Sequence, residues 1–288
     1  MMAAEVSALT IANYNPAQHD RFASGYATSP TPNTSASFIG AGLDFSGVGW
    51  NPSVPTQSFA MISDEYFIYA SHFAPSTQLS FFSPITSSVV NFGVDPNFTP
   101  VRATSTITGG QTTDLMVGRL ANSVASAGIT SYPILHVANR NGLVGLTALL
   151  YGHGGSDTAS PRIGTNTIEG FVDYSVPASN VYGNTGILYT NGTGPTGEAS
   201  FQNGDSGSPS FVVLNGSLVL LGNHSATATD GQGNSYSLDT YLAQYIQELA
   251  DAGIPLIAVP VAVPEPTRAF LLIIGLFAAF CQRRRSAN

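Results

Sequence analysis

The stretch Ser58–His72, SFAMISDEYFIYASH, carries two apolar runs on either side of a short polar segment. The polar segment is Ser63-Asp64-Glu65, and the second apolar run is Tyr66–Ala70. Short apolar runs separated by a polar turn are typical of paired β-strands. The second run ends in a pair of small residues before His72, so we expect this histidine to lie at the end of a strand.

The rest of the chain has the same texture. Thirty glycines and eighteen prolines, with many Ser, Thr and Asn, interrupt it at short intervals, and apolar runs lie between the interruptions. Three of these runs are Leu146–Tyr151, Phe211–Leu214 and Leu218–Leu221. Many short strands with frequent turn signals predict an all-β sandwich or barrel. Single β-domains of roughly 250 residues are common, so the 288 residues allow one sizeable core.

One helix is expected after these strands. Asp239 is the expected N-cap, and Gly253 and Pro255 are expected to end the helix. Four apolar residues between them recur at the 3.6-residue spacing of a helix face, which predicts core packing. They are Leu242, Tyr245, Ile246 and Leu249.

Charge is scarce and unevenly distributed. Charged residues make up 9% of the chain, against roughly 25% in an ordinary soluble domain. There is no lysine, and the first 263 residues hold five Arg against sixteen Asp and Glu, a net charge of −11. This balance argues against a nucleic-acid binder, which needs a basic surface. The single cysteine, Cys281, leaves no intrachain disulfide and no Cys-based zinc site.

The strongest catalytic motif is Asn203-Gly-Asp-Ser-Gly-Ser-Pro209. A serine held in such a tight turn can expose its hydroxyl, while the backbone N–H groups of Gly204 and Ser206 point toward one place, as an oxyanion hole requires. A catalytic serine also needs a base and an orienting carboxylate. His72 and Asp114, which opens the apolar run DLMVGRL, supply those two residue types upstream.

The order His72, Asp114, Ser206 resembles that of the chymotrypsin-like (trypsin family) serine proteases. It differs from the orders in subtilisin and the α/β-hydrolases. The resemblance spans about residues 36–252 and includes three further stretches that are similar to family strands or hairpins. These stretches are Tyr151–Gly154, Asn215–Leu218 and Gly222–Ser225.

The resemblance implies two six-stranded antiparallel β-barrels with the active site between them. Ser206 would be the nucleophile, His72 the general base and acid, and Asp114 the group that orients His72. The amides of Gly204 and Ser206 would form the oxyanion hole, the substrate would be a protein or peptide, and no metal or organic cofactor would be needed.

Four positions bear on specificity and activation. By counting back from Ser206, the floor of the primary specificity pocket falls near Ser200, and Ser225 would border the pocket and help bind Asp114. A neutral floor disfavours cleavage after Lys or Arg and favours a neutral, small or apolar residue, although a small indel would bring Glu198 there. The chain has no Ile-Val-Gly-Gly start, so Asp205 needs a partner other than a freed N-terminus.

Other interpretations stay open at this point. Asp95, before a proline, competes with Asp114 as the triad acid, although it lacks a following apolar strand. His153 and His224 are expected to be structural, and His19 and His136 carry no signal. The competing functions are a non-catalytic surface or matrix protein on a trypsin-like fold, and an esterase on another fold, which the residue order disfavours.

The C-terminus resembles the PEP-CTERM sorting signal of Gram-negative bacteria. It reads Pro264-Glu265-Pro266, then thirteen apolar residues (269–281), then Arg283, Arg284 and Arg285. Thirteen residues are short of the roughly 20 that span a bilayer, so we expect a transient membrane anchor. Three arginines after the run would stay cytoplasmic, which places the protein's bulk outside. The resemblance implies export and recognition by an exosortase-type sorting enzyme.

These observations divide the chain into four parts. Residues 1–35 are either the remnant of an export signal or the start of the domain. Residues 36–254 form the protease-like domain, residues 255–268 a Pro-rich linker with the PEP motif, and residues 269–288 the hydrophobic helix and Arg cluster.

Overall fold

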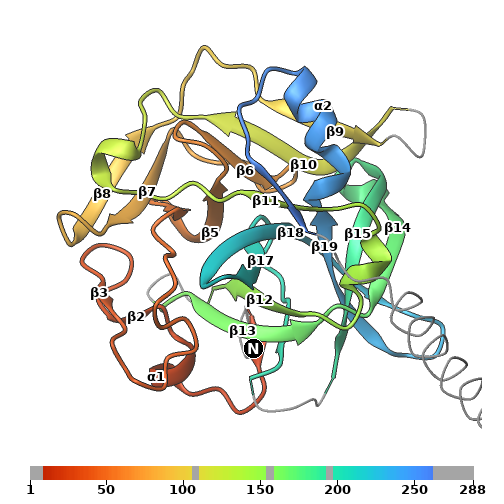
Figure 1. Ribbon diagram of the computed structural model, residues 1–288, viewed down its shortest axis with the longest axis horizontal. Helices are drawn as coiled ribbons and strands as arrows, with labels where there is room; N and C mark the ends of the chain where they lie inside the picture. The colour runs from red at the N-terminus through yellow and green to blue at the C-terminus, as the bar shows by residue number, and fades with distance from the viewer. Residues whose placement is uncertain (1–8, 106–109, 154–158, 193–196, 262–288) are drawn as a thin grey trace, which may run out of the picture.

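The computed structural model describes residues 9–105, 110–153, 159–192 and 197–261. Two β-sheets dominate this part of the chain, one built from the first half and the other from the second (Figure 1). The predicted sorting signal, including Pro264–Pro266 and the Arg cluster, lies outside the described residues. Within the described ranges, no helix is both long and apolar enough to cross a membrane.

The first sheet has seven strands in the order β8-β7-β4-β5-β6-β10-β9, all antiparallel to their neighbours. Most neighbours follow each other along the chain, as expected for hairpins. The strands are β4 (Val48–Asn51), β5 (Val54–Met61), β6 (Tyr66–Ala70), β7 (Gln78–Ser83), β8 (Ser88–Gly93), β9 (Val101–Ser105) and β10 (Gln111–Arg119).

The second sheet has nine strands, seven of which follow the antiparallel order β13-β12-β17-β18-β19-β15-β14. The other two, β11 and β20, pair in parallel with each other, and β11 also pairs in parallel with β18. The strands are β11 (Ile134–Val137), β12 (Thr147–Gly152), β13 (Arg162–Thr167), β14 (Gly170–Val176), β15 (Val181–Asn191), β17 (Pro209–Leu214), β18 (Ser217–Thr229), β19 (Ser235–Tyr241) and β20 (Ala258–Val261).

The prediction of a mostly β protein with two sheet domains is confirmed, and the expected strand at Tyr66–Ala70 coincides with β6. Two details of the prediction are wrong. The sheets have seven and nine strands instead of six each, and the second is not wholly antiparallel. The second sheet gains the parallel strands β11 and β20, and β20 begins inside the expected Pro-rich linker. Its Pro260, which has no N–H to donate, is tolerated on this edge strand.

The expected helix is shorter than its apolar spacing suggests. A 3-10 turn, η4 (Leu242–Tyr245), precedes the α-helix α2 (Ile246–Asp251). Asp239 is not an N-cap, because β19 continues to Tyr241 and the Asp239 carboxylate is buried among side chains of the second sheet. Three of the predicted core positions, Leu242, Tyr245 and Leu249, are buried.

The residues before the first sheet fold against both sheets. Strand β1 (Thr10–Ile11) pairs with β16 (Ala199–Ser200), just before the predicted catalytic serine, and β2 (Phe22–Ser24) pairs with β3 (Thr31–Pro32). The short helices of this and later segments are α1 (Pro16–His19), η1 (Ala125–Ala127), η2 (Arg140–Leu143) and η3 (Pro177–Ser179).

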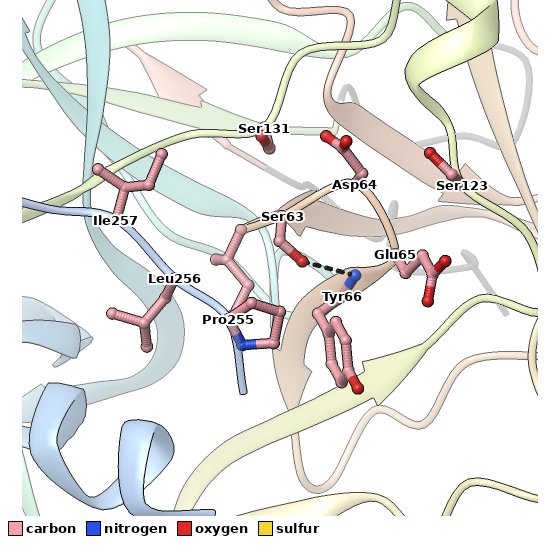
Figure 2. A pocket seen from close by; sticks show the side chains of 10 residues that line it. Ser63, Asp64, Glu65, Tyr66, Ser123, Ser131, Pro255, Leu256 and Ile257 are labelled. Atoms are coloured by element: carbon pink, nitrogen blue, oxygen red, sulfur yellow. Dashed lines mark hydrogen bonds between the residues drawn. The ribbon is translucent and has the colours of Figure 1, made fainter. Parts of the chain in front are cut away.

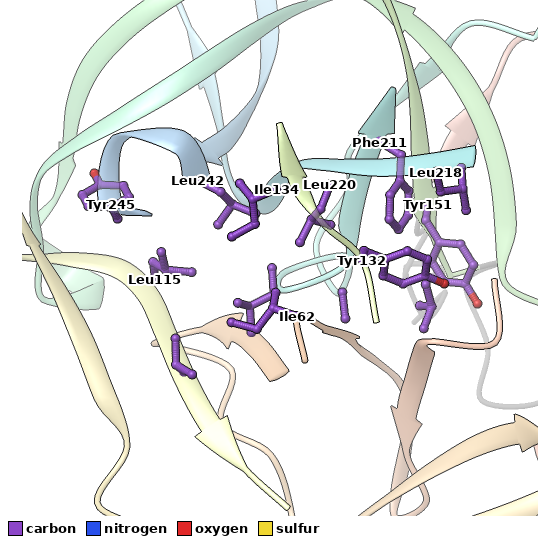
Figure 3. Close-up of a cluster of buried hydrophobic side chains, with 14 of the residues drawn as sticks. Ile62, Leu115, Tyr132, Ile134, Tyr151, Phe211, Leu218, Leu220, Leu242 and Tyr245 are labelled. Carbon is purple, nitrogen blue, oxygen red and sulfur yellow. The ribbon is translucent and has the colours of Figure 1, made fainter. Parts of the chain in front are cut away.

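An apolar core joins the two sheets. Ile62 and Leu115 from the side of the first sheet contribute to the same buried cluster as Leu220 and Phe211 of the second (Figure 3). The Tyr132 ring, in the segment that connects the sheets, packs edge-on against Phe211 at 4.9 Å between ring centroids. Burial of these side chains fixes how the sheets face each other.

Arg21 adds a buried polar link to this core. Its guanidinium donates to the carbonyl oxygens of Phe45 (2.7 Å) and Val48 (2.8 Å), and to the hydroxyl of Tyr151 in the second sheet (2.9 Å). The side chain therefore ties the N-terminal segment to both sheets. Its three bonds satisfy a charge that is removed from water, as a buried charge requires.

We expect Arg21→Met to lower the free energy of unfolding by about 3 kcal/mol, because buried oxygen acceptors lose their donor. Arg21→Lys should recover only part of the loss, since one ammonium cannot reproduce the planar fork of donors. Urea denaturation followed by the fluorescence of Trp50, the only tryptophan, measures both. A loss below about 1 kcal/mol for the Met variant would contradict this account.

Candidate active site

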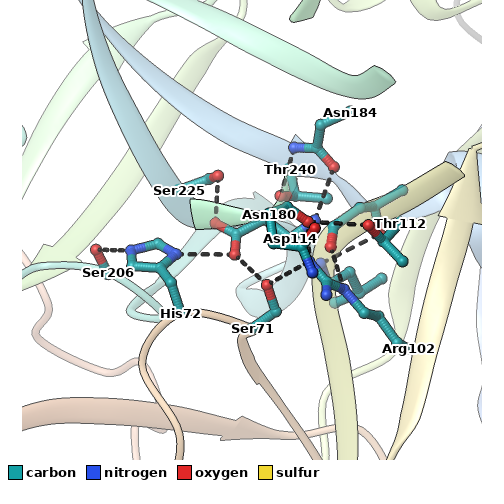
Figure 4. Close-up of polar contacts among 12 residues, drawn as sticks. Ser71, His72, Arg102, Thr112, Asp114, Asn180, Asn184, Ser206, Ser225 and Thr240 are labelled. Atoms are coloured by element: carbon teal, nitrogen blue, oxygen red, sulfur yellow. Dashed lines mark hydrogen bonds and ion pairs between the residues drawn. The ribbon is translucent and has the colours of Figure 1, made fainter. Parts of the chain in front are cut away.

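Strand pairing brings two of the predicted catalytic residues together. β6 and β10 are antiparallel, with Ala70 opposite Leu115. The chain that leaves β6 therefore passes beside Asp114, and the backbone N–H of Ser71 donates to the Asp114 carbonyl at 2.9 Å. His72 follows directly, so its ring lies next to the Asp114 side chain (Figure 4).

His72 lies between the other two members of the predicted triad. Its Nδ1 is 2.8 Å from Asp114 Oδ1, and its Nε2 is 2.8 Å from Ser206 Oγ. The Asp114 side chain is 1% exposed, whereas His72 is 26% exposed. A carboxylate only accepts hydrogen bonds, so Nδ1 donates and Nε2 is left to accept the Ser206 proton. This arrangement can activate a serine hydroxyl.

Two serines complete the shell of the Asp114 carboxylate. Ser225, in β18 of the second sheet, donates to Oδ2 at 2.5 Å, and Ser71 donates to Oδ1 at 2.9 Å. With His72, three donors hold the buried carboxylate in place. The structure thus brings Ser225 to the predicted site, whereas the role of Ser71 was not predicted, because only its small size was considered.

The turn around Ser206 contains two glycines in left-handed backbone conformations. Gly204 and Gly207 have φ values of +105° and +83°, which L-residues rarely adopt. Neither the Gly204 amide nor the Ser206 amide donates a hydrogen bond to another described residue. Both remain available to a developing oxyanion. Ser208, which replaces the last glycine of the family motif, has no positive φ, so its side chain causes no backbone strain.

Asp205, next to the serine, has a partner in the N-terminal segment. Its carboxylate accepts the backbone N–H groups of Leu9 (2.8 Å), Gln202 (2.9 Å) and His153 (3.0 Å). The group is buried, and this burial raises its pKa from 3.8 to about 6. The sequence indicated that Asp205 needed a partner, but nothing in it pointed to Leu9.

A hollow of about 390 Å³ opens beside Ser206 and His72. The Phe201 ring stacks on the His224 ring in its wall, with the ring centroids 3.6 Å apart. Ser225 also lines this hollow, as predicted. Ser200 does not, because it is paired with Thr10 and faces a different hollow, so the predicted pocket floor is corrected. Counting residues could not anticipate the β1–β16 pairing.

His224 belongs to a buried polar network in this wall. Its Nδ1 is 2.5 Å from Asp239 Oδ1, and its Nε2 is 2.7 Å from the Tyr151 carbonyl oxygen. Both ring nitrogens thus face oxygen atoms of neighbouring residues. Asp239 also accepts from Ser210 and Tyr189. The network supports the prediction of a structural role for His224.

The remaining candidates lie away from the triad. Asp95 forms an ion pair with Arg119, whose Nε donates at 3.0 Å, and this contact lowers the pKa of Asp95. His19 and His153 are buried, and His136 is exposed. Within the described ranges, no group of three or more His, Cys, Asp or Glu side chains could hold a metal ion.

A second hollow, of about 460 Å³, lies next to the polar turn between β5 and β6 (Figure 2). Ser63, Asp64 and Glu65 line one side of it, and residues 255–257 line the other. None of the triad residues borders it. The predicted triad therefore borders the hollow beside Ser206 and not this one.

Comparisons with known proteins agree with this architecture. No family model matches the chain, and no curated protein matches it. A solved structure described as the atomic resolution structure of HBP has 16% identity and a TM-score of 0.51, and the match covers 75% of this chain and 95% of that one. The fold is trypsin-like.

A mutant of human heparin binding protein (CAP37) is also similar, with 14% identity and a TM-score of 0.49, over 72% of this chain and 91% of that one. At such identities a likeness concerns the trypsin-like fold alone. Any activity has to be argued from the side chains of this chain.

The buried Asp205 gives a pH-dependent prediction. Its folded-state pKa is raised from 3.8 to about 6, so its contribution to stability is full below pH 3.8 and is lost as the pH rises through about 6. Asp205→Asn lacks this titration. The stability of the variant relative to wild type should therefore improve between about pH 4 and pH 7, on the order of 2–3 kcal/mol, as measured by urea denaturation.

Asp95→Asn is the matched control. Arg119 lowers the pKa of Asp95, so its stabilising contribution exists above pH 3.8 and is lost as the pH falls. The free energy of unfolding of Asp95→Asn should thus fall relative to wild type as the pH rises, opposite to the change expected for Asp205→Asn. A flat difference for Asp205→Asn would show that its carboxyl titrates alike in the folded and unfolded chain.

Proposed function

We propose that this chain is an exported serine endopeptidase that hydrolyses peptide bonds through an acyl-enzyme intermediate. The observation that carries the proposal is the continuous contact Asp114–His72–Ser206, with two distances of 2.8 Å. The two open amides of Gly204 and Ser206 lie in the same turn as the nucleophile. A non-catalytic protein on this fold has no need to keep these features together.

The first half of the proposed reaction forms the acyl-enzyme. Ser206 Oγ attacks the peptide carbonyl carbon, and its proton moves to His72 Nε2. The negative charge on the carbonyl oxygen is stabilised by the Gly204 and Ser206 amides. When the carbon–nitrogen bond breaks, His72 gives the proton to the leaving amine.

The second half is hydrolysis of the ester. Water takes the place of the amine, His72 removes its proton, and the oxygen–carbon bond to Ser206 breaks as the proton returns to Oγ. Asp114 stays ionised throughout, holds Nδ1–H in one orientation and stabilises the imidazolium that forms twice per turnover. No metal or organic cofactor is assigned a role.

For the substrate, we propose a protein or peptide with a neutral residue before the cleaved bond. The Phe201 ring lines the hollow and stacks on His224. The lining contains no arginine or lysine that could pair with an acidic side chain, and the carboxylate of its one acidic residue, Asp205, is buried and already bound by three backbone N–H groups. A small or apolar side chain fits this environment better than a long charged one.

A fluorophosphonate probe tests the proposal. Wild-type protein should be labelled at Ser206, as mapped by peptide mass spectrometry. Ser206→Ala and His72→Ala should lose labelling and reduce peptide hydrolysis by at least about 10⁴-fold. Ser208→Ala is the matched control, because this buried serine of the same motif touches none of the triad, and it should label normally. Folded wild-type protein that stays unlabelled would contradict the proposal.

For cellular location, we propose that residues 264–285 direct the exported protein to an exosortase-type enzyme and anchor it transiently in the membrane. The support is the sequence order of Pro264-Glu265-Pro266, the apolar run and Arg283–Arg285. Co-expression with such an enzyme should yield protein that lacks the Arg cluster by intact-mass analysis. Replacing Pro264–Pro266 by Ala should leave the Arg cluster in place. An Arg cluster retained in the wild-type protein as well as in the Ala variant would contradict the proposal.

A further inference from the structure

The guanidinium group of Arg102 is linked to the triad through the hydroxyl of Ser71. Arg102, in β9, donates from Nη2 to Ser71 Oγ at 2.9 Å, and Ser71 Oγ donates to Asp114 Oδ1 at 2.9 Å (Figure 4). Asp114 Oδ1 is the same oxygen that faces His72 Nδ1. One line of hydrogen bonds therefore runs from Arg102 to the catalytic base.

The chemistry of the groups fixes the direction of this line. A guanidinium has only donors, and an ionised carboxylate has only acceptors. The Ser71 hydroxyl between them has one proton, so it accepts from Arg102 and gives its proton to Asp114. If the serine turned away, the Arg102 donor and the Asp114 acceptor would both lose this partner in a partly buried site.

Other contacts hold the guanidinium in this position. Arg102 Nε donates to the carbonyl oxygen of Thr113 at 2.7 Å, directly before Asp114 in β10. Nη2 also donates to the carbonyl oxygen of Asn180 at 2.7 Å, in the turn that joins β14 and β15 of the second sheet. Arg102 thus joins three parts that must stay in register: the end of β6, the start of β10 and a turn of the second sheet.

The charged and titratable groups around this line can be named. Glu248 on α2 faces β9 and accepts from Thr104, two residues beyond Arg102. Tyr174 of β14 borders the carboxylate pocket, and burial raises its pKa, so the phenol stays neutral. Asp173, its neighbour, accepts from Thr185. Among the described residues, none of these groups forms an ion pair with Arg102, and the charge that acts on its guanidinium is that of Asp114.

We propose that Arg102 is a positioning residue for the triad. It holds the Ser71 hydroxyl on Asp114, and its positive charge lets the His72 ring stay neutral, and so able to accept a proton, down to a lower pH. This inference rests on the proposed peptidase function. The second effect follows from electrostatics, because a cation disfavours the addition of another positive charge nearby. Arg102 acts on His72 through Ser71 and Asp114 and not by direct contact. Its effect on the protonation of His72 is therefore moderate, since effective dielectric constants near 20 apply even to buried sites.

The test compares pH profiles of kcat/KM for a peptide substrate. Arg102→Met removes both charge and hydrogen bonds, so the midpoint of the acid limb should rise by roughly 0.5–1 pH unit, and the plateau should fall about tenfold. Arg102→Lys keeps the charge but not the fork of donors, so its midpoint should stay near wild type while the plateau falls. Ser71→Ala should behave like Arg102→Lys.

Arg119→Met is the control, because it removes the same charge from β10 at an ion pair with Asp95, remote from the triad. It should leave midpoint and plateau unchanged. A plateau loss in Arg102→Met with an unmoved midpoint would reduce Arg102 to a structural role and overturn the proposal. If Arg102→Met fails to fold, a midpoint that rises in the soluble Arg102→Lys variant would equally overturn it.

A second measurement separates this inference from the proposed function. NMR titration of isotope-labelled histidines in Ser206→Ala protein follows protonation of His72 without any need for turnover. Arg102→Met added to that background should move the His72 titration upward by the same roughly 0.5–1 pH unit. If wild-type protein neither hydrolyses peptides nor labels, the peptidase proposal fails, and an upward shift of His72 in the Ser206→Ala background would still support the Arg102 inference. No shift would contradict the inference alone.

Discussion

The burial of the Asp114 carboxylate is the constraint on which the site depends. A buried charge is costly unless donors surround it, and here the donors come from separate parts of the fold. Ser71 and His72 follow β6 of the first sheet, whereas Ser225 lies in β18 of the second. The two sheets therefore have to meet in one arrangement to satisfy this group. The apolar core supplies most of the energy for that contact, and the carboxylate selects its geometry.

A second buried carboxylate organises the other half of the site. Asp205 accepts three backbone N–H groups, one of them from Leu9. The N-terminal segment, the turn that carries Ser206, and His153, which follows β12, are thereby joined. This contact explains how the turn can keep glycines at positive φ and leave the amides of Gly204 and Ser206 open.

Much of the site could be predicted from sequence because it rests on local patterns. β6 matches its apolar run, and the turn motif marks Ser206. Contacts between distant segments could not be predicted in this way. The pocket floor was assigned to Ser200 by counting, but pairing with β1 turns this residue to another hollow, and Phe201 lines the site instead. Asp239 fits the pattern of a helix cap, yet its carboxylate binds His224, 15 residues away.

The central claim is that the Gly204 and Ser206 amides and the triad act together on one reacting carbon. A crystal structure of the protein after reaction with a peptidyl phosphonate tests it most directly. The account predicts a bond from Ser206 Oγ to phosphorus, the phosphoryl oxygen within about 3 Å of both amide nitrogens, and His72 still bonded to Asp114. An unmodified Ser206, or a phosphoryl oxygen directed away from both amides, would contradict it.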